Sequence, residues 1–368
     1  MIDNWSIMGE LSHRAGKSRS RAAKRLKALD LFSGCGGLTE GMKLAGFDVL
    51  GGVEIDPLSA ESYHLNHPDA TLWIDDIRRL DPAMVMADLK LKEGDLDLLA
   101  GCPPCQGFST IRTRKKTTAA DDPRNALVND FLRFVRVMRP RAIMLENVPG
   151  LASFDGFKTV ERLLTEAGYQ CRYDVLDAAD FGVPQRRRRF VLLGSWRDEI
   201  PFASPLPKRK TVRDAIGGLA DVGASGDPLH DVSEKRSSRI VDMIARIPHD
   251  GGSRSGLPHR MQLRCHRECE GFRDVYGRMA WDDVAPTITA GCINPSKGRF
   301  LHPEQDRAIT PREAALLQSF PPGYKFSLRQ GKYGAARLIG NAFPPEFARH
   351  HAHQVALYLN AAQGGTNG

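Results

Sequence analysis

The chain has 368 residues, of which 41% are hydrophobic and 26% are charged, and its formal net charge is +8. Its seven cysteines are an odd number at irregular spacing, which excludes a small disulfide-stapled scaffold and favours a reducing compartment. No apolar run approaches the length of about 18 residues that a membrane span needs, and the N-terminus has no secretory apolar core. We therefore expect a cytoplasmic protein, and the basic balance favours a polyanionic partner.

The first 23 residues are rich in basic and small side chains, and we expect a flexible tail there, solvated or in loose contact with phosphate. A short apolar strand at 28–31 then runs into the glycine-rich turn 33–37, and a helix follows. This strand–loop–helix order is typical of nucleotide-type folds, in which backbone approaches a ligand closely. The turn does not match the G-x-G-x-x-G fingerprint of dehydrogenases.

Acidic residues end the next two predicted strands. The strand 49–53 ends in Glu54, and a carboxylate at this place after a glycine turn suits the diol of a ribose. The alternation at 71–77 carries Asp76 and Ile77, a carboxylate and an aliphatic side chain that can bind and flank an adenine. The alternative interpretation of each acidic residue is that it is an ordinary surface carboxylate without a ligand. A glycine turn followed by one acid per strand nevertheless indicates a nucleotide-like ligand.

A thiol follows the predicted strand at 96–99, in the stretch Gly101-Cys102-Pro103-Pro104-Cys105. Two prolines fix the backbone ahead of Cys105. Three interpretations compete: a plain turn, a C-x-x-C redox pair, and a nucleophilic thiol at Cys105. A thiol held rigidly at the C-terminal edge of a strand is well placed to meet a ligand.

The stretch 109–118 is polar, basic and without hydrophobic period, which predicts a mobile lid over a phosphate-bearing substrate. A helix follows, and its apolar residues from 127 to 138 share one face until Pro140 ends it. The strand 142–145 then delivers Glu146 to the same sheet edge as the thiol.

Four arginines at 186–189 enter the apolar strand 190–194. Alternation along a strand sends two of them to each side of the sheet. A guanidinium that is buried in this way needs a carboxylate or a ligand as its partner. A solvated basic run is the alternative interpretation.

From about residue 218 the chain is rich in glycine, arginine and histidine and shows no βα alternation until about residue 309. Cys265 and Cys269 form a single C-x-x-x-C, which is weak evidence for a metal site, and we expect none. Thr310-Pro311 begins a helix, and the last helix covers 345–360. The expected organisation is a tail at 1–23, a catalytic and cofactor-binding domain at 24–217 completed by 336–361, a smaller basic domain and hinge at 218–335, and a tail at 362–368.

Taken in order, these motifs resemble the DNA (cytosine-5) methyltransferases. The matching segments are Asp30-Leu31-Phe32-Ser33-Gly34-Cys35-Gly36-Gly37, Glu54, Asp76-Ile77, Pro104-Cys105-Gln106, Glu146-Asn147-Val148, Gln185-Arg186-Arg187-Arg188-Arg189, Arg312-Glu313, Gln318-Ser319-Phe320-Pro321 and Gly340-Asn341. The resemblance implies an α/β fold with the Rossmann-like, mostly parallel sheet of S-adenosylmethionine-dependent methyltransferases. It also implies a smaller, loop-rich recognition domain, with DNA in the cleft between the two. The departures are mild, with Cys35 inside the glycine turn and Ala342-Phe343 after Asn341.

The chemistry of this family can be checked against the residues. Cytosine C5 is a poor nucleophile, and a thiolate added at C6 turns the ring into an enamine whose C5 can attack a methyl sulfonium. We expect Cys105 to be that nucleophile, and Glu146, when protonated, to donate to N3 and accept from the exocyclic amine. The family's Gln-x-Arg-x-Arg spacing falls on Gln185, Arg187 and Arg189, so we expect Arg189 on O2 and Arg187 ordering the site. The target base must first be flipped out of the duplex.

The resemblance implies S-adenosyl-L-methionine as the cofactor, lying across the glycine turn. Phe32 would pack on the adenine, Glu54 would hold the ribose, and Asn341 would close the pocket. The expected cofactor contacts are Asp30, Phe32, Ser33, Gly34, Gly36, Gly37, Glu54, Asp76, Ile77, Pro104, Asn341 and Ala342. The expected DNA contacts are Gln106, Ser109, Arg112, Arg114, Lys115, Arg254 and Arg264.

The resemblance implies a nucleoid-associated monomer that acts on double-stranded DNA away from membranes, with a separately acting restriction endonuclease as a compatible partner. Three alternatives stay open: a tRNA cytosine-5 methyltransferase of the same fold, a C-x-x-C thiol oxidoreductase, and a DNA-binding module without catalysis. The sizeable basic region after residue 218 favours DNA over tRNA.

Overall fold

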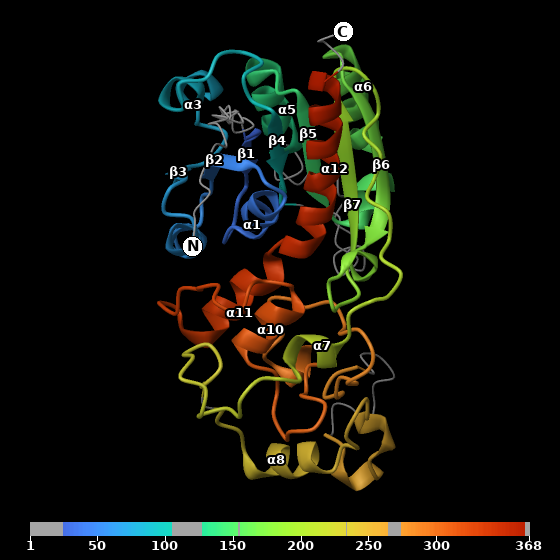
Figure 1. The fold of residues 1–368 in the computed structure, drawn as a ribbon. Helices are drawn as coiled ribbons and strands as arrows, with labels where there is room; N and C mark the ends of the chain where they lie inside the picture. Colours follow the sequence, from blue (N-terminus) through green and yellow to red (C-terminus); the bar gives the residue numbers. More distant parts are fainter. Residues whose placement is uncertain (1–24, 105–126, 154, 233, 264–273, 365–368) are drawn as a thin grey trace, which may run out of the picture.

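The computed structural model describes residues 25–104, 127–153, 155–232, 234–263 and 274–364. Within them, one sheet has seven strands in the order β3-β2-β1-β4-β5-β7-β6 (Figure 1). The strands are β1 (Lys27–Leu31), β2 (Asp48–Val53), β3 (Thr71–Trp73), β4 (Leu98–Gly101), β5 (Ala142–Asn147), β6 (Gln170–Asp177) and β7 (Arg188–Ser195). All neighbours pair in parallel except β7, which is antiparallel to both β5 and β6. The predicted mostly parallel α/β sheet is confirmed.

Helices cover both faces of the sheet. On one face α1 (Gly37–Leu44) and α12 (Pro345–Gly364) pack side by side in a shared apolar core. On the other face lie α3 (Pro82–Asp88), α5 (Leu127–Met138) and α6 (Asp155–Glu166). Because both faces are covered, the central strands are continuous apolar runs, as in β4, where all four residues are buried. The apolar face expected for the helix at 127–138 is buried, which confirms that prediction.

Three local predictions differ from the structure. The strand expected at 71–77 ends at Trp73, because Asp75 accepts a hydrogen bond from the backbone N–H of Asp76 and starts a turn. The apolar residues at 163–167 also predict a helix, and in the structure this helix is α6, which begins earlier, at Asp155, and ends at Glu166. The helix α2 (Pro57–Asn66) was not anticipated, although Asp56 caps its N-terminus and Pro57 occupies its first turn.

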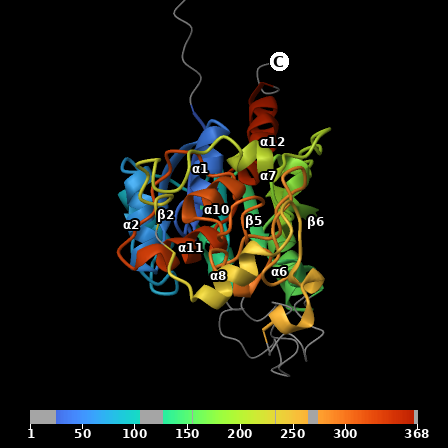
Figure 2. The same cartoon turned by 90° about the horizontal axis from the view of Figure 1, so that it is seen from below.

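A second body lies below the sheet, and Figure 2 shows its helices α8, α10 and α11 in front of the strands when the molecule is seen from below. Its helices are α7 (Val212–Ile216), α8 (Ser238–Ala245), α10 (Pro311–Leu317) and α11 (Gly331–Asn341), with the 3₁₀ helices Arg254–Gly256, His259–Met261 and Pro295–Lys297. Thr310 and Glu313 form the capping box that begins α10, with Pro311 in its first turn. Two further apolar cores hold this body, and one of them includes Cys35 and Leu58 of the upper body.

In the described parts of the chain, we find no helix whose length and apolar character would allow it to span a bilayer.

His351 on α12 carries a stability prediction. It is fully buried among aromatic rings, and in the part of the chain that the structure describes neither ring nitrogen has a hydrogen-bond partner. A buried polar group without a partner costs about 1–3 kcal/mol. We therefore expect His351→Leu to raise the free energy of unfolding at pH 7 by about 1 kcal/mol. His353→Leu, at an exposed position on the same helix, is the matched control and should change little.

The same residue makes stability depend on pH. Burial lowers the pKa of His351 from 6.5 to about 3, so the unfolded chain binds more protons than the folded one between these values. His351 therefore adds no pH-dependent cost above about pH 6.5, and below it the folded state loses stability progressively as the pH falls towards 3. Urea denaturation at pH 7 and pH 5 should show a smaller acid loss for His351→Leu than for the wild type. An equal acid loss, or a less stable variant at pH 7, would contradict this account.

Candidate active site

Glu146, Arg187 and Arg189, three of the expected catalytic residues, meet at the carboxyl edge of the sheet, whereas Cys105 lies outside the described residues. Strands β4 and β5 are parallel, so their ends carry Cys102 and Glu146 to the same edge. Strand β7 runs the other way, and its beginning therefore lies beside the end of β5, where Asn147 pairs with Phe190. This reversal brings the arginine run at the start of β7 to the carboxylate at the end of β5.

Glu146 and Arg189 form an ion pair there. Oε1 of Glu146 lies 2.9 Å from Nε of Arg189, and the two side chains are 12% and 15% exposed. Burial raises the pKa of Glu146 above its usual range, although the guanidinium groups of Arg189 and Arg187 act in the opposite direction. A carboxyl with a raised pKa takes up a proton more readily, and donation to a ring nitrogen requires that proton.

Arg187 and Gln185 join this edge to the lower body. Arg187 donates from Nη1 to the carbonyl of Ile288 at 2.9 Å and from Nη2 to those of Gly340 and Ala342 at 3.2 and 3.0 Å. Gln185 accepts from the backbone N–H of Ile288 at 2.9 Å. Both side chains are buried, whereas Arg186 and Arg188 are exposed. The predicted alternation of the four arginines is confirmed, and the buried Arg187 has carbonyl oxygens instead of a carboxylate as its hydrogen-bond partners.

A cavity of about 290 Å³ opens beside this pair, and we call it the strand-edge cavity; its volume is near the lower end for small-molecule sites. It is lined by Cys102, Pro103, Pro104, Glu146, Asn147, Val148, Arg187, Arg189, Gly340 and Asn341. Nδ2 of Asn147 donates to the carbonyl of Pro103 at 3.1 Å and so fixes the backbone that leads towards Cys105. The cavity therefore combines a carboxyl group, a guanidinium group and the backbone segment that leads to Cys105.

Cys102 bears on the redox interpretation of the C-x-x-C spacing. Burial, together with the neighbouring carboxylate of Glu146, raises its pKa well above the usual value of 9.0. A thiol in this state is protonated at neutral pH, whereas a reactive redox cysteine needs thiolate character. The environment of Cys102 therefore does not favour a thiol oxidoreductase.

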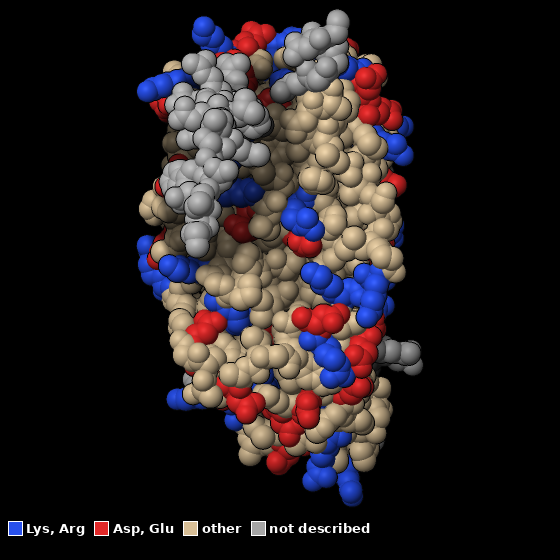
Figure 3. Space-filling model, viewed as in Figure 1, with Lys and Arg blue, Asp and Glu red and all other residues tan. Residues whose placement is uncertain are grey.

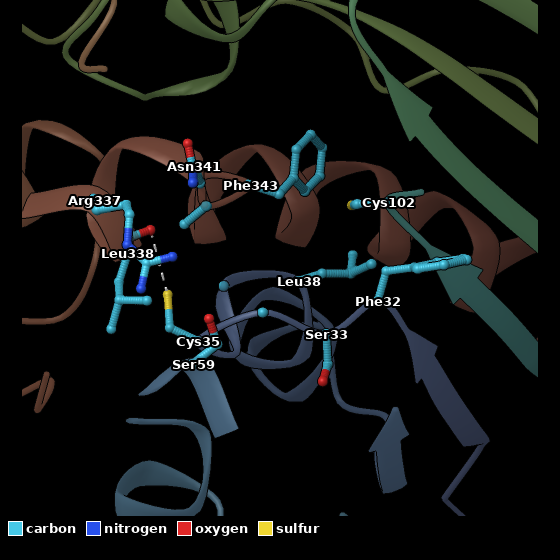
Figure 4. Close-up of a pocket in the computed structure, with 13 residues that line it drawn as sticks. Phe32, Ser33, Cys35, Leu38, Ser59, Cys102, Arg337, Leu338, Asn341 and Phe343 are labelled. Atoms are coloured by element: carbon cyan, nitrogen blue, oxygen red, sulfur yellow. Dashed lines mark hydrogen bonds between the residues drawn. The ribbon is translucent and has the colours of Figure 1, made fainter. Parts of the chain in front are cut away.

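A second cavity lies over the glycine turn, and we call it the glycine-turn cavity (Figure 4). The turn forms one side of it, and the segment from Arg337 to Phe343 forms the other. Outside the segment from Arg337 to Phe343, the lining residues are Phe32, Ser33, Gly34, Cys35, Gly37, Leu38, Ser59 and Cys102. Cys102 and Asn341 line both cavities, so the two spaces adjoin at these residues.

Two residues that directly follow neighbouring strands flank the glycine turn, and of these only Phe32 lines the cavity. Phe32, directly after β1, adopts a φ of 61°, a strained conformation for a bulky residue that is found mostly at functional sites. Glu54, directly after β2, accepts hydrogen bonds from the backbone N–H groups of Gly34 and Asp56 at 2.8 and 2.7 Å. Burial raises its pKa above the usual range. Each oxygen keeps a lone pair for a further donor, as a ribose diol would need.

The structure places six expected cofactor residues outside the lining of the glycine-turn cavity: Asp30, Gly36, Glu54, Asp76, Ile77 and Pro104, the last of which lines the strand-edge cavity instead. Asp30 is fully buried and accepts a hydrogen bond from Thr39 at 2.7 Å, and burial raises its pKa to about 7. Ile77 is 4% exposed and packs in the core of the sheet. Asp76 pairs with Arg78, and Gly36 faces Tyr324. Direct cofactor contact by Asp30 and Ile77 is therefore not supported, because apolar packing and burial take these side chains away from the ligand space.

Several expected site residues lie outside the described residues: Cys105, Gln106, Ser109, Arg112, Arg114, Lys115, Arg264, Cys265 and Cys269. Arg254 is described, and it is only 6% exposed. A guanidinium at this position is not presented to a DNA surface, so we withdraw Arg254 as a DNA contact. Within the described residues, no group of three or more histidine, cysteine, aspartate or glutamate side chains could hold a metal ion.

Residues that were not expected as ligand contacts also line these cavities, among them Cys102, Asn147, Ser59 and Arg337. Asn147 follows Glu146 directly, so a second polar residue at the same strand end was a usable signal. Arg337 lies one helical turn before Asn341, which also places it towards the same ligand. Ser59 and Cys102 carry no comparable signal, because their place depends on how α2 and β4 pack against distant segments.

The chain was compared with known proteins. A family model described as C-5 cytosine-specific DNA methylase matches residues 26–356. The chain is 38% identical over 345 residues to the type II methylase M.HgiDII of Herpetosiphon aurantiacus, covering 90% of this chain and 95% of that protein. It is 34% identical over 338 residues to the type II methyltransferase M1.HphI of Haemophilus parahaemolyticus, covering 90% and 86%.

Solved structures are similar over almost the whole chain. A DNA modification methyltransferase encoded within a prophage of E. coli matches with a TM-score of 0.71 and 25% identity, over 91% of this chain and 99% of that one. The S. pombe Dnmt2 methyltransferase shares the fold, with a TM-score of 0.59 and 21% identity over 92% and 99%. With the family model matching most of the chain, these similarities and the site geometry establish that the chain belongs to the C-5 cytosine-specific DNA methylases.

Proposed function

We propose that this chain transfers a methyl group from S-adenosyl-L-methionine to C5 of a cytosine flipped out of a specific duplex DNA sequence, through a covalent bond between Cys105 and C6. The observation that carries this proposal is the largely buried ion pair between Glu146 and Arg189, in a cavity that adjoins the glycine-turn cavity at Cys102 and Asn341. An acid and a cation beside a second ligand space are what addition to a pyrimidine and transfer of a methyl group require.

The residues divide the chemistry as follows. The thiolate of Cys105 adds to C6, and Glu146 donates its proton to N3 so that the ring accepts the electron pair. Arg189 binds O2 and stabilises the charge that develops there. Arg187 and Gln185 hold the segments around Ile288 and Gly340 and thereby position the site. After C5 has gained the methyl group, a base removes the C5 proton and the Cys105 thiolate leaves.

The residues around the glycine turn fit S-adenosyl-L-methionine. A Cβ on Gly34 would meet no atom within 4 Å, so the turn leaves open space on the cavity side. Phe32 supplies an aromatic ring and Glu54 a carboxylate, as an adenine and a ribose diol would require. When bound, the cofactor supplies the electrophilic methyl group. Asn341 lies where the two cavities adjoin and would close the cofactor pocket.

We assign catalysis and cofactor binding to 24–217 with 336–361, and target recognition to 218–335. DNA would lie between these parts, with 106–122 closing over the flipped base; that segment lies outside the described residues. A monomer suffices for this arrangement, with any restriction endonuclease acting separately. On the face shown in Figure 3, acidic and basic side chains are interspersed over the lower body, so this face is not a uniformly basic surface for phosphate.

A cavity of about 470 Å³ beside α8 is a better candidate for phosphate contact. Its lining residues are Ser238, Arg239, Asp242, Met243, Arg246, Arg260 and Met261. Arg239 and Arg246 are exposed, and within the described chain neither has an ion-pair partner. Free guanidinium groups on one helix are suited to bind a DNA backbone.

Replacing Arg239 and Arg246 together by alanine should weaken binding to duplex DNA and flatten its salt dependence. Each phosphate contact that is lost lowers the slope of log K against log salt by about one. Fluorescence anisotropy at several salt concentrations measures this slope. Arg162→Ala is the control, because Arg162 lies on the distant α6 and pairs with Glu166. A slope unchanged in the double variant would remove the α8 cavity from the DNA interface.

The reaction is tested by incubating the protein with S-adenosyl-L-methionine and unmodified duplex DNA, digesting the DNA to nucleosides, and detecting 5-methyl-deoxycytidine by mass spectrometry. We expect product with the wild type and none with Cys105→Ala. The variants Cys171→Ala and Cys102→Ser should both stay active; Cys171 is a free cysteine on β6. Product on tRNA alone would show that tRNA, and not DNA, is the substrate. A loss with Cys102→Ser equal to that with Cys105→Ala would favour thiol redox chemistry. No product on either nucleic acid would refute the proposal.

A further inference from the structure

A chain of three hydrogen bonds runs along the far side of the glycine turn. Nζ of Lys43 lies 3.2 Å from Nδ1 of His67, and Nε2 of His67 lies 3.0 Å from Oη of Tyr324. The Tyr324 hydroxyl then donates to the carbonyl oxygen of Cys35 at 2.7 Å. His67 is 0% exposed and Tyr324 is 3% exposed, so water does not compete for these bonds.

The direction of every bond in this chain follows from its chemistry. A Lys43 ammonium can only donate, so Nδ1 of His67 is the acceptor and Nε2 carries the ring proton. Nε2–H therefore donates to Tyr324, whose own proton is free to go to Cys35. Burial lowers the pKa of His67 to about 4, which keeps the ring neutral at physiological pH.

Tyr324 is itself held from the lower body. Nη1 of Arg312, on α10, donates to the Tyr324 carbonyl at 2.9 Å, and the rings of Phe320 and Phe326 lie 4.7 and 5.3 Å from the Tyr324 ring. Tyr324 also lies close to the turn, because a Cβ on Gly36 would stand 2.5 Å from Oη of Tyr324. The apolar core of the lower body that contains Phe320 and Phe326 therefore holds the Tyr324 hydroxyl against the turn.

The turn needs such a restraint. Gly34 and Gly36 have φ values of 56° and 92°, and glycine peptides rotate more freely than others in the unbound state. On the upstream side, the backbone N–H of Gly36 donates to the carbonyl of Ser33 at 2.9 Å, and that of Ser33 to Val53 at 3.0 Å. The Tyr324 hydroxyl fixes the carbonyl of the intervening peptide, between Cys35 and Gly36. A peptide fixed before binding lowers the entropic cost of binding a ligand.

We propose that Tyr324 and His67 are positioning residues that preorganise the glycine turn for the cofactor. Affinity for S-adenosyl-L-methionine therefore depends on this pair, whereas the chemical step at the strand-edge cavity does not. The inference rests on the proposed function, because it takes the glycine-turn cavity as the cofactor site. It also assigns the lower body a role in cofactor binding beside its role in target recognition.

Calorimetry with S-adenosyl-L-homocysteine tests the proposal on the full chain. We expect Tyr324→Phe to bind this probe about three- to tenfold more weakly, as the loss of one buried neutral hydrogen bond implies. The kcat at saturating cofactor should stay within about twofold, since only preorganisation of the turn has changed. Tyr358→Phe is the matched control, because its hydroxyl accepts from Ser195 and Asp198 at 2.7 and 3.1 Å on a distant part of α12.

A second variant separates the roles of the two residues. His67→Leu should weaken binding of the probe by a similar factor. The double variant with Tyr324→Phe should lose less affinity than the product of the two single losses, because both residues belong to one hydrogen-bonded chain. Wild-type affinity in Tyr324→Phe, or an equal loss in Tyr358→Phe, would overturn the inference. A wild type that does not bind the probe would instead refute the assignment of the cofactor cavity.

Discussion

Replacing Glu146 with glutamine is expected to lower kcat for methyl transfer by about 10²–10⁴-fold, the range that general acid catalysis supplies. Glutamine is nearly isosteric, and its amide can still donate to N3 and accept from the exocyclic amine of the cytosine. It cannot transfer a proton. The loss should therefore fall on kcat, while affinity for duplex DNA stays within a few-fold of the wild type.

Single-turnover kinetics with saturating DNA and cofactor measure this effect directly. Glu161→Gln, on the surface helix α6, is the matched control and should be fully active. If Glu146 only held the base by hydrogen bonds, the glutamine variant would keep most of the activity, and a rate within tenfold of the wild type would exclude proton transfer from this side chain.

Replacing Arg278 with methionine is expected to lower the free energy of unfolding by about 3–5 kcal/mol, because it removes the buried charge from a set of acceptors built around it. Arg278 is 0% exposed and also pairs with Asp306. Its guanidinium donates at 2.7–3.2 Å to the carbonyl oxygens of Ile244, Ile247, His302 and Gln305. Two of these carbonyls lie at the C-terminal end of α8 and just beyond it, so the same change should loosen the α8 cavity.

Scanning calorimetry and urea denaturation give the stability of the variant. Arg213→Met is the matched control: Arg213 is about half exposed and pairs with Asp282, so its loss should cost at most about 1 kcal/mol. Equal destabilisation by both variants would mean that burial of Arg278 contributes nothing beyond a surface ion pair. Arg278→Lys should not restore stability, since one ammonium cannot reach all of these oxygens.

Most of the sheet could be predicted from the sequence because its strands are short apolar runs that end in polar or glycine residues. The strand before Glu54 and the strand before Glu146 were both found in this way. Alternation predicted that the four arginines at 186–189 divide two to each side of the strand. Each of these inferences uses neighbouring residues only, which is why sequence was sufficient.

The remaining features depend on contacts between distant segments. The pairing of Glu146 with Arg189 requires β7 to lie antiparallel beside β5, and no local pattern gives a strand its direction. Arg254 looked like a DNA contact because it is basic and lies among glycines, yet the second body buries it. Asp30 looked like a ligand contact by position, but its side chain is fully buried and its Oδ2 accepts a hydrogen bond from Thr39 on α1.

The return of α12 to the sheet has a consequence for how the protein is made. The face that α12 covers beside α1 is complete in sequence once β7 ends at Ser195, but α12 begins only at Pro345. At about 5–20 residues per second, a ribosome needs about 8–30 s to cross that interval. During this time the nascent sheet exposes an apolar face, and a chaperone has a defined surface to protect until the recognition segment has been synthesised.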